Sequence, residues 1–164
     1  ANMLGLAFEE ASELISKFNR KAPFVKLLSD RCMNKANNEG TIRTKLGRKC
    51  RFDMWETKDF GIHTPETFEN ASAKYGASNI KRAFTYKALN RLIQGSAADQ
   101  TKKAILDCYN NGFLPLIQIH DELCFSVSDD KDVDKIKSVM ESAVELKVPN
   151  KVDVALGKDF GEAI

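Results

Sequence analysis

Hydrophobic residues recur every three or four positions near the start of the chain, the spacing of one helix face. In residues 7–18 this stripe comprises Phe8, Ala11, Leu14, Ile15 and Phe18. Pro23, favoured at the first helical position, begins a second helical pattern that ends in the turn-prone segment 37–40. This part of the chain is therefore predicted to form two consecutive helices.

After Gly40 the pattern changes to β-favouring residues mixed with cations. Residues 41–52 (TIRTKLGRKCRF) have a central Gly47, which predicts a two-stranded ribbon or an extended loop. A run of charged residues is most often simply a solvated surface. A run with this many cations is also suited to binding phosphates. Its cations are Arg43, Lys45, Arg48, Lys49 and Arg51.

The middle of the chain is predicted to hold a polar surface insertion and then the longest helix. Residues 57–78 favour a small helix with Thr64 as N-cap, Pro65 at its first position and Gly76 as its stop. A helix is expected from residue 80 to about residue 110, interrupted only by Gly95. Because glycine costs a helix roughly 1 kcal/mol relative to alanine, Gly95 calls for a close-approach reason.

Residues 114–127 (LPLIQIHDELCFSV) contain two β-type runs joined at His120 and Asp121. The alternation of Leu123, Phe125 and Val127 predicts one buried and one polar face. A charged helix at about 132–146 and a short strand at 152–156 are expected to follow. The order of elements predicts an α+β fold, with an antiparallel hairpin packed against several helices, one of them long and central.

Composition narrows the class of protein without identifying it. The 164 residues are 43% hydrophobic and carry a net charge of +2, which argues against wholesale disorder and does not by itself indicate a nucleic-acid binder. Apolar runs near 18 residues, the length of a membrane span, are absent from the sequence. The spacing of the four cysteines does not fit a zinc knuckle, so reduced thiols and a cytoplasmic setting are expected.

The turn at His120 and Asp121, followed by Glu122, is the first candidate for chemistry. Two-residue hairpin turns favour glycine because they require positive φ, so a His-Asp turn costs local stability without an obvious structural gain. Carboxylates at a strand end suit a hard cation such as Mg²⁺. For an isolated triplet, however, an ordinary polar turn is the commoner explanation.

A second candidate is the helix face that carries Lys87, Asn90 and Gln94, at i, i+3 and i+7. All four base pairs present acceptors in the minor groove, so amide donors there can check pair geometry without reading sequence. The simpler alternative is that these amides are solvated or satisfy nearby backbone groups.

These motifs together resemble the family A DNA polymerases, the DNA polymerase I type, and especially their bacteriophage members. The resemblance rests on KALNRLIQGSAAD (residues 87–99) followed by LPLIQIHDELCFSV, with TIRTKLGRKCRF before them. It extends to AFEEASELISKFNRKAPFVKLL, similar to the helix pair after the fingers, and to VDVALGKDFGEAI, similar to the closing strand and tail. Nearly the whole chain is covered.

The resemblance implies roles for individual residues. Asp121 corresponds to a ligand of the catalytic metals, His120 to a residue near the primer terminus, and Glu122 to a supporting carboxylate. Asn90 and Gln94 correspond to minor-groove contacts with primer-template DNA. The implied chemistry is two-metal nucleotidyl transfer from a dNTP to the primer 3′-hydroxyl, with Mg²⁺ as cofactor.

The sequence also departs from the family pattern. The sequence has no match to the first palm motif, whose Asp is the other obligatory metal ligand, and none to the fingers helix. Tyr86 stands where many members of the family have an Arg. The second Asp ligand is thus expected outside this chain, on an upstream portion or subunit. We therefore expect half of an active site, inactive alone, in a polymerase that is either split or represented by a fragment, working in the cytoplasm of a host cell if phage-encoded.

This interpretation predicts three regions and leaves alternatives open. The regions are a helix pair with the basic ribbon beside the fingers (1–56), a surface insertion (57–78), and a palm portion with the DNA-contacting helix and catalytic hairpin (79–164). A non-catalytic DNA-binding module derived from a polymerase is the main alternative. A metal-dependent nuclease ranks last, because it needs more clustered carboxylates than Asp121 and Glu122.

Overall fold

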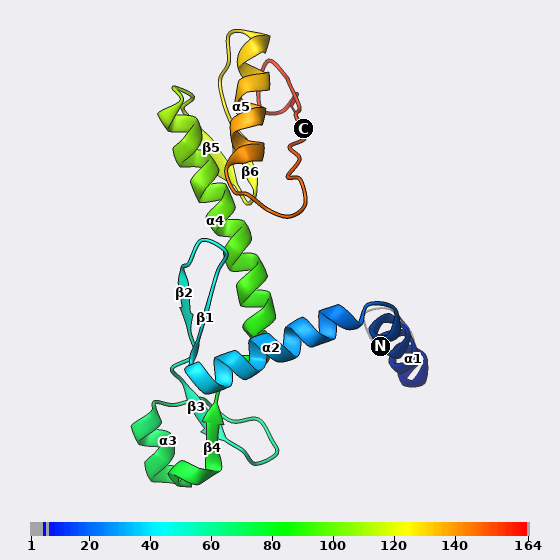
Figure 1. Cartoon of the computed structure of the whole chain (residues 1–164), viewed down its shortest axis with the longest axis vertical. Helices are drawn as coiled ribbons and strands as arrows, with labels where there is room; N and C mark the ends of the chain where they lie inside the picture. Colours follow the sequence, from blue (N-terminus) through cyan, green and yellow to red (C-terminus); the bar gives the residue numbers. More distant parts are fainter. Residues whose placement is uncertain (1–4, 6, 164) are drawn as a thin grey trace. The chain divides into compact units, whose positions relative to one another are not determined.

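The computed structural model describes residues 5 and 7–163, so the first residues of the expected 1–56 region lie partly outside the described residues. Figure 1 shows a mixed α+β chain of helices and small antiparallel hairpins with one long helix, which confirms the predicted fold class. The chain divides into two compact units, Ala1–Gly95 and Ser96–Ile164. The expected division into three regions stays a prediction.

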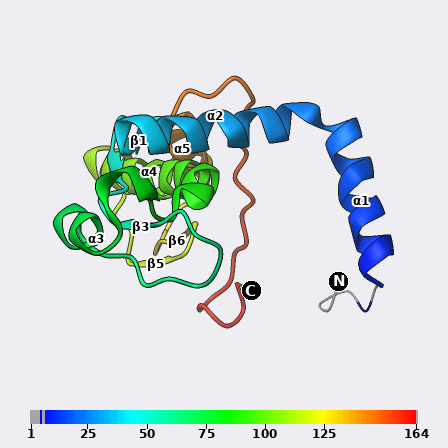
Figure 2. The same ribbon diagram turned by 90° about the horizontal axis from the view of Figure 1, so that it is seen from below.

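The first unit begins with the two predicted helices, α1 (Phe8–Lys21) and α2 (Pro23–Glu39). Gly40 ends α2 with φ of 67°, a left-handed conformation that glycine adopts without steric cost. Figure 2 shows that α1 and α2 meet at a steep angle where the two helices join. None of the α1 side chains is buried. The described residues therefore do not bury the apolar stripe of this helix.

The predicted basic ribbon is confirmed as the antiparallel pair β1 (Thr41–Arg43) and β2 (Lys49–Arg51). Ile42 and Phe52 point inward and join a small core with Cys32 and Ala36 of α2 and with Ala88. Apolar burial is the main favourable term in folding, so this core ties the ribbon to the helices around it. The cations of the ribbon are left on its exposed side.

The 57–78 segment folds back onto the strand that precedes it. The next two strands, β3 (Trp55–Thr57) and β4 (Ile80–Arg82), pair antiparallel, with α3 (Phe68–Tyr75) and the 3₁₀ turn η2 (Ala77–Asn79) between them. Gly76 ends α3 as predicted, but the predicted start at Thr64 and Pro65 is wrong. Thr67 is the N-cap, because its hydroxyl accepts a hydrogen bond from the Asn70 backbone.

The long helix is α4 (Ala88–Asn110), and its predicted start at residue 80 is wrong. Residues 80–82 form β4 instead, because β3 offers them a partner and Ile80 is buried there. The 3₁₀ turn η3 (Thr85–Lys87) follows, after Phe84 with φ of 61°. Lys87 therefore precedes α4 rather than belonging to it.

The second unit contains the predicted hairpin, β5 (Ile117–Ile119) and β6 (Glu122–Cys124), followed by α5 (Asp130–Ser142). The predicted alternation is not realised, since Leu123, Cys124 and Phe125 are all half-buried and Val127 is exposed. The strand expected at 152–156 is also wrong. This segment is irregular, because a strand needs a neighbouring strand to take its hydrogen bonds and the described residues offer it none.

The four cysteines carry free thiols, as expected. Burial raises the pKa of the Cys32 thiol, and burial, followed by the nearby Asp107 carboxylate, raises the pKa of Cys108. Among the described residues, no helix combines the length and the apolar character needed to cross a lipid bilayer.

Candidate nucleic-acid interface

The basic ribbon presents its cations to solvent from a locally constrained turn. Between β1 and β2 the Thr44 backbone N–H donates to the Arg48 carbonyl at 2.9 Å, and the Thr44 hydroxyl accepts from the Arg48 backbone N–H at 3.0 Å. Gly47 provides the positive φ of the turn, and Arg43 donates to its carbonyl at 2.8 Å. The side chains on the exposed surface are Arg43, Lys45, Arg48, Lys49 and Arg51.

The ribbon lies directly against the start of α4, which explains Gly95. The Arg48 guanidinium donates to the Gly95 carbonyl at 2.7 Å. A Cβ on Gly95 would lie 2.9 Å from the methyl carbon of Thr44, closer than packed side chains come. The sequence-based expectation of a close approach at Gly95 is confirmed, and the neighbour is the basic ribbon.

Asn90 and Gln94 are both exposed on the first turns of α4. They are four residues apart, so they lie on one face of the helix. Arg91, between them, donates to the carbonyl of Arg51 at 3.1 Å and lies over the Phe52 ring at 4.8 Å. The first turns of α4, which carry Asn90 and Gln94, are thus held beside the basic ribbon within the first unit through Arg91 and Gly95.

Lys87 has a different setting from the one that a continuous helix would give it. It ends the 3₁₀ turn η3, and its ammonium lies 5.1 Å from the centroid of the Phe84 ring and 5.5 Å from that of Tyr86. Its charge is therefore placed beside two aromatic faces. Because Lys87 lies outside α4, its predicted helical spacing of i, i+3 and i+7 with Asn90 and Gln94 holds only approximately.

His120, Asp121 and Glu122 lie together at the tip of the β5–β6 hairpin in the second unit. Ile119 pairs with Glu122, so His120 and Asp121 form the two-residue turn that the sequence predicts. His120 has φ of 53°; among described residues other than glycine, only Phe84 shares a positive φ. All three side chains are exposed, and the carbonyl of His120 accepts from the Gln118 amide at 3.0 Å.

The donor set of this turn fits part of a magnesium site. Mg²⁺ takes oxygen ligands and is often held by one or two carboxylates together with substrate phosphates. Asp121 and Glu122 are carboxylates of that kind on a strand end. Within the described chain, no group of three or more histidine, cysteine, aspartate or glutamate side chains comes together as a metal site, so other ligands would be required.

Two residues near η3, Arg82 and Phe84, were missed by sequence reasoning. Arg82 donates to the carbonyls of Asn37 and Phe52 and lies over the ring of Trp55, while Phe84 adopts the positive φ noted above. The predicted helix from residue 80 concealed them. The β-branched Ile80 directly after an Asn-containing turn was the available sign of a strand.

The comparisons with known proteins agree with these features. The sequence model of DNA polymerase family A matches residues 1–162. A DNA-directed DNA polymerase of Pseudomonas phage M6 is 36% identical over 155 residues, which are 94% of this chain and 20% of that protein. The thermostable DNA polymerase I of Thermus filiformis is 28% identical over 167 residues, 98% of this chain and 18% of that protein.

A solved structure is similar over the same extent. The POL domain of Pol1 from M. smegmatis, in complex with DNA primer-template and dNTP, has a TM-score of 0.74 and 26% identity, covering 99% of this chain and 27% of that chain. The chain spans about a fifth of the length of the two curated relatives named above. Since the family's sequence model covers residues 1–162, the chain belongs to DNA polymerase family A.

Proposed function

We propose that this chain is the C-terminal part of a template-dependent DNA polymerase, in which it binds primer-template DNA and contributes one catalytic carboxylate. The observation that carries the proposal is the Asp121 carboxylate, exposed at a two-residue hairpin turn within a chain of DNA polymerase family A. The M. smegmatis protein with the similar fold was solved with primer-template and dNTP, which supports the same ligands here.

The first unit is proposed to hold the duplex. Asn90 and Gln94 would donate from their side-chain amides to purine N3 and pyrimidine O2 in the minor groove, which tests base-pair geometry but not sequence. Lys87 and the five cations of the basic ribbon would contact phosphates. Such contacts give affinity that is independent of sequence and falls with salt.

The second unit is proposed to contribute to the reaction centre. Asp121 would be a metal ligand, Glu122 would support it, and His120 would lie near the primer terminus. Bound Mg²⁺ would activate the primer 3′-hydroxyl and neutralise charge on the triphosphate. The role of the chain itself is to keep the Asp121 oxygens at a fixed position, which the short turn favours because it leaves few backbone conformations.

Synthesis is proposed to require a second Asp and a triphosphate-binding helix from outside these 164 residues, on an upstream portion or subunit. Two neighbouring carboxylates fall short of the ligands that two magnesium ions need, even with substrate oxygens added. We therefore expect no primer extension by the chain alone. The region boundaries at 56/57 and 78/79 are part of the same proposal.

The test is to purify the assembly that contains this chain from its native source, weigh its components by mass spectrometry, and measure primer extension. Asp121→Asn in that assembly should abolish extension while DNA affinity stays within about twofold of the parent, because a single neutralised metal ligand leaves the phosphate contacts intact. Asp134→Asn, on the exposed side of α5, is the matched control. Extension by the pure 164-residue chain would contradict the partner requirement.

A non-catalytic DNA-binding module remains the second candidate. It is favoured by the placement of the duplex-binding residues in a unit with its own small core, apart from Asp121. In this case Asp121→Asn would leave every activity of the assembly unchanged while charge removal from the ribbon would weaken DNA binding. The two outcomes for Asp121 therefore separate the two functions.

A further inference from the structure

Arg91 lies between the two amides of α4 that are proposed to contact the minor groove, yet its own contacts are with the basic ribbon. Its guanidinium donates to the Arg51 carbonyl at 3.1 Å and lies 4.8 Å from the centroid of the Phe52 ring. Successive residues of a helix point about 100° apart, so Arg91 turns toward the ribbon while Asn90 stays exposed. The guanidinium is therefore directed at the protein's own backbone and ring.

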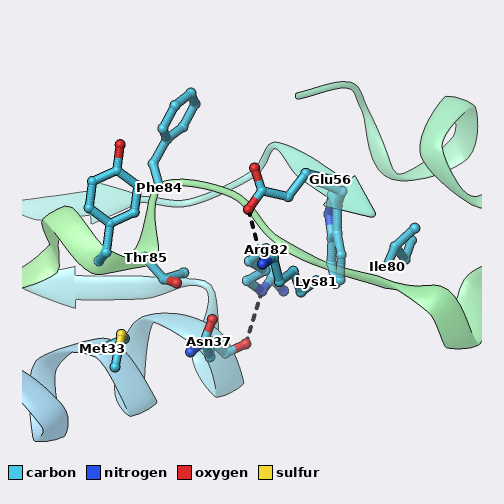
Figure 3. A pocket seen from close by; sticks show the side chains of 10 residues that line it. Met33, Asn37, Glu56, Ile80, Lys81, Arg82, Phe84 and Thr85 are labelled. Atoms are coloured by element: carbon cyan, nitrogen blue, oxygen red, sulfur yellow. Dashed lines mark hydrogen bonds and ion pairs between the residues drawn. The ribbon is translucent and has the colours of Figure 1, made fainter. Parts of the chain in front are cut away.

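Phe52, whose ring Arg91 contacts, is fixed through both its backbone and its side chain. Its N–H donates to the Gly40 carbonyl at 2.8 Å, and its carbonyl accepts from the Arg82 guanidinium at 2.9 Å. Arg82 also donates to the Asn37 carbonyl, as Figure 3 shows, and so connects Phe52 to the last turns of α2. The ring is 2% exposed and belongs to the core of the first unit. Arg91 thus attaches α4 to the best-anchored part of the ribbon.

A second contact between α4 and the ribbon lies about one helical turn further along. The Arg48 guanidinium donates to the Gly95 carbonyl at 2.7 Å. Each of the two contacts directly follows a proposed duplex contact, since Asn90 precedes Arg91 and Gln94 precedes Gly95. The spacing between the two amides and the cations of the ribbon is therefore set at two points.

We propose that Arg91 is a positioning residue that sets how strictly mispaired primer ends are rejected. The amides of Asn90 and Gln94 can test base-pair geometry only if α4 keeps a fixed distance from the strand whose phosphates the ribbon holds. If α4 and the ribbon could shift relative to each other, the amides would follow a displaced base and accept it. The inference rests on the proposed function, because it gives a task to a residue beside the proposed duplex site.

This task differs from that of the ribbon cations. A phosphate contact adds affinity for every duplex, paired or mispaired, and makes that affinity fall with salt. A residue that fixes spacing changes the ratio between paired and mispaired ends, because only this ratio depends on where the amides meet the base pair. Loss of folded protein lowers the activity on both ends by the same factor. The ratio therefore separates positioning from charge and from stability.

The experiment measures primer extension by the native assembly on two DNA substrates that differ only in the last primer base, which is paired or mispaired. The readout is the discrimination ratio, defined as kcat/KM for the paired end divided by kcat/KM for the mispaired end. Arg91→Met keeps an unbranched apolar stem and loses both the hydrogen bond and the cation over the ring. We expect the discrimination ratio to fall about fivefold, the effect of about one hydrogen bond. The dependence of duplex affinity on salt should stay unchanged, because no phosphate contact is lost.

Three other variants show what the change in ratio means. Lys49→Ala removes a proposed phosphate contact, so it should lower kcat/KM for both ends and keep the ratio. Gln94→Leu removes a proposed minor-groove donor, so it should lower the ratio directly. Arg31→Met is the matched control for the lost charge, since Arg31 is an exposed arginine of α2, and it should leave the ratio and the salt dependence unchanged.

A double variant tests whether Arg91 acts through the ribbon. Phe52→Leu removes the ring that Arg91 contacts, so it should lower the discrimination ratio by itself. Phe52→Leu added to Arg91→Met should lower the ratio little further than Arg91→Met alone, because the two residues form one contact. Losses that multiply would show that Arg91 acts independently of Phe52, which would overturn the inference.

The remaining outcomes separate this inference from the proposed function. A ratio that is unchanged in Arg91→Met and lower in Gln94→Leu overturns the inference and leaves the proposed function standing. A salt slope that falls by about one in Arg91→Met also overturns it, because Arg91 would then be a phosphate contact. If Gln94→Leu leaves the ratio unchanged, the amides do not test the base pair, and the proposed duplex site fails together with the inference.

Discussion

Two antiparallel hairpins of equal length carry the proposed functions, yet their surroundings differ. The ribbon β1–β2 has Ile42 at 3% exposure and Phe52 at 2% in a core shared with α2 and Ala88. In β5, by contrast, every residue is exposed, including Ile117 at 50%. A two-stranded hairpin is marginally stable by itself, so packing decides whether it is fixed.

The contrast indicates that the two hairpins, and with them the proposed duplex site and the proposed catalytic carboxylate, depend on different structural support. The ribbon and the start of α4 fix each other through the Arg48 and Arg91 hydrogen bonds and the apolar core beneath them. The hairpin of Asp121 presents apolar side chains such as Leu116 and Ile117 to solvent, and exposed apolar patches commonly mark interaction surfaces. Its proposed partner would therefore serve to cover these strands as well as to add metal ligands.

The largest expected effect tests this contrast with the same substitution in both hairpins. Ile42→Ala should lower the free energy of unfolding by about 2–4 kcal/mol, because it opens a cavity in the core. Ile117→Ala should cost the isolated chain less than about 1 kcal/mol, since the side chain is already half solvated. Urea unfolding followed by circular dichroism measures both values.

Equal losses for the two substitutions would show that β5 is packed as tightly as β1 in solution, and the contrast would fail. In the native assembly, the effect of Ile117→Ala should grow if a partner covers β5. Comparing the isolated chain with the assembly therefore extends the test from stability to partner binding.

Sequence periodicity predicted the elements that are stabilised locally and missed those that depend on distant partners. Helices α1 and α2, the ribbon and the hairpin turn follow from spacing, cap residues and turn residues. β4 was missed because its pairing with β3 spans the whole of α3, and the 152–156 strand was wrongly expected because strand propensity cannot provide a neighbour. In both cases long-range pairing decided the outcome.

A smaller effect concerns the contact between the ribbon and α4. Gly95→Ala should destabilise the first unit by about 1–2 kcal/mol, because the new methyl group would collide with the buried Thr44 side chain and outweigh the gain in helix propensity. Thr44→Ser in the same chain should restore most of the loss. Serine removes the methyl group and keeps the hydroxyl that accepts from the Arg48 backbone N–H. Thermal unfolding of the single and double variants is the measurement.

A gain in stability from Gly95→Ala alone would show that the helix-propensity effect dominates and that the ribbon stands further from α4 in solution. Failure of Thr44→Ser to rescue would place the collision elsewhere. Either result would weaken the claim that the ribbon and α4 fix each other.

Charge removal on the ribbon should have a still smaller effect, seen in binding. Lys49→Ala should weaken duplex binding about fivefold and lower the slope of log affinity against log salt by about one, as for one lost phosphate contact. Lys147→Ala, an exposed lysine after α5, should change neither value. Titrations at several salt concentrations measure the slope. An unchanged slope for Lys49→Ala would make the ribbon a solvated charged face.

The candidate site, like the fold, was predictable where it depends on local sequence and not where it depends on distant partners. The exposed amides and cations follow from local spacing, and Gly95 was expected to mark a close approach. The cavity between α2, the β3–β4 pair and η3, shown in Figure 3, was not predictable, because Trp55 and Phe84 line it together with Arg82 only through the β3–β4 pairing. The roles of His120, Asp121 and Glu122 stay predictions, since metal ligation depends on groups that the local sequence does not contain.

The smallest expected effect concerns the strain at the tip of the β5–β6 hairpin. His120 has φ of 53°, which costs a side-chain-bearing residue about 1 kcal/mol and glycine almost nothing, although glycine loses more chain entropy on folding. His120→Gly should therefore stabilise the hairpin by about 0.5 kcal/mol, seen as slower amide hydrogen exchange in β5 and β6. Asp121→Gly, at a turn position without positive φ, should speed exchange instead. If His120→Gly also speeds amide exchange, the imidazole itself stabilises the turn. If exchange slows while DNA synthesis by the native assembly falls, the strain at His120 is kept because the side chain is needed for the reaction.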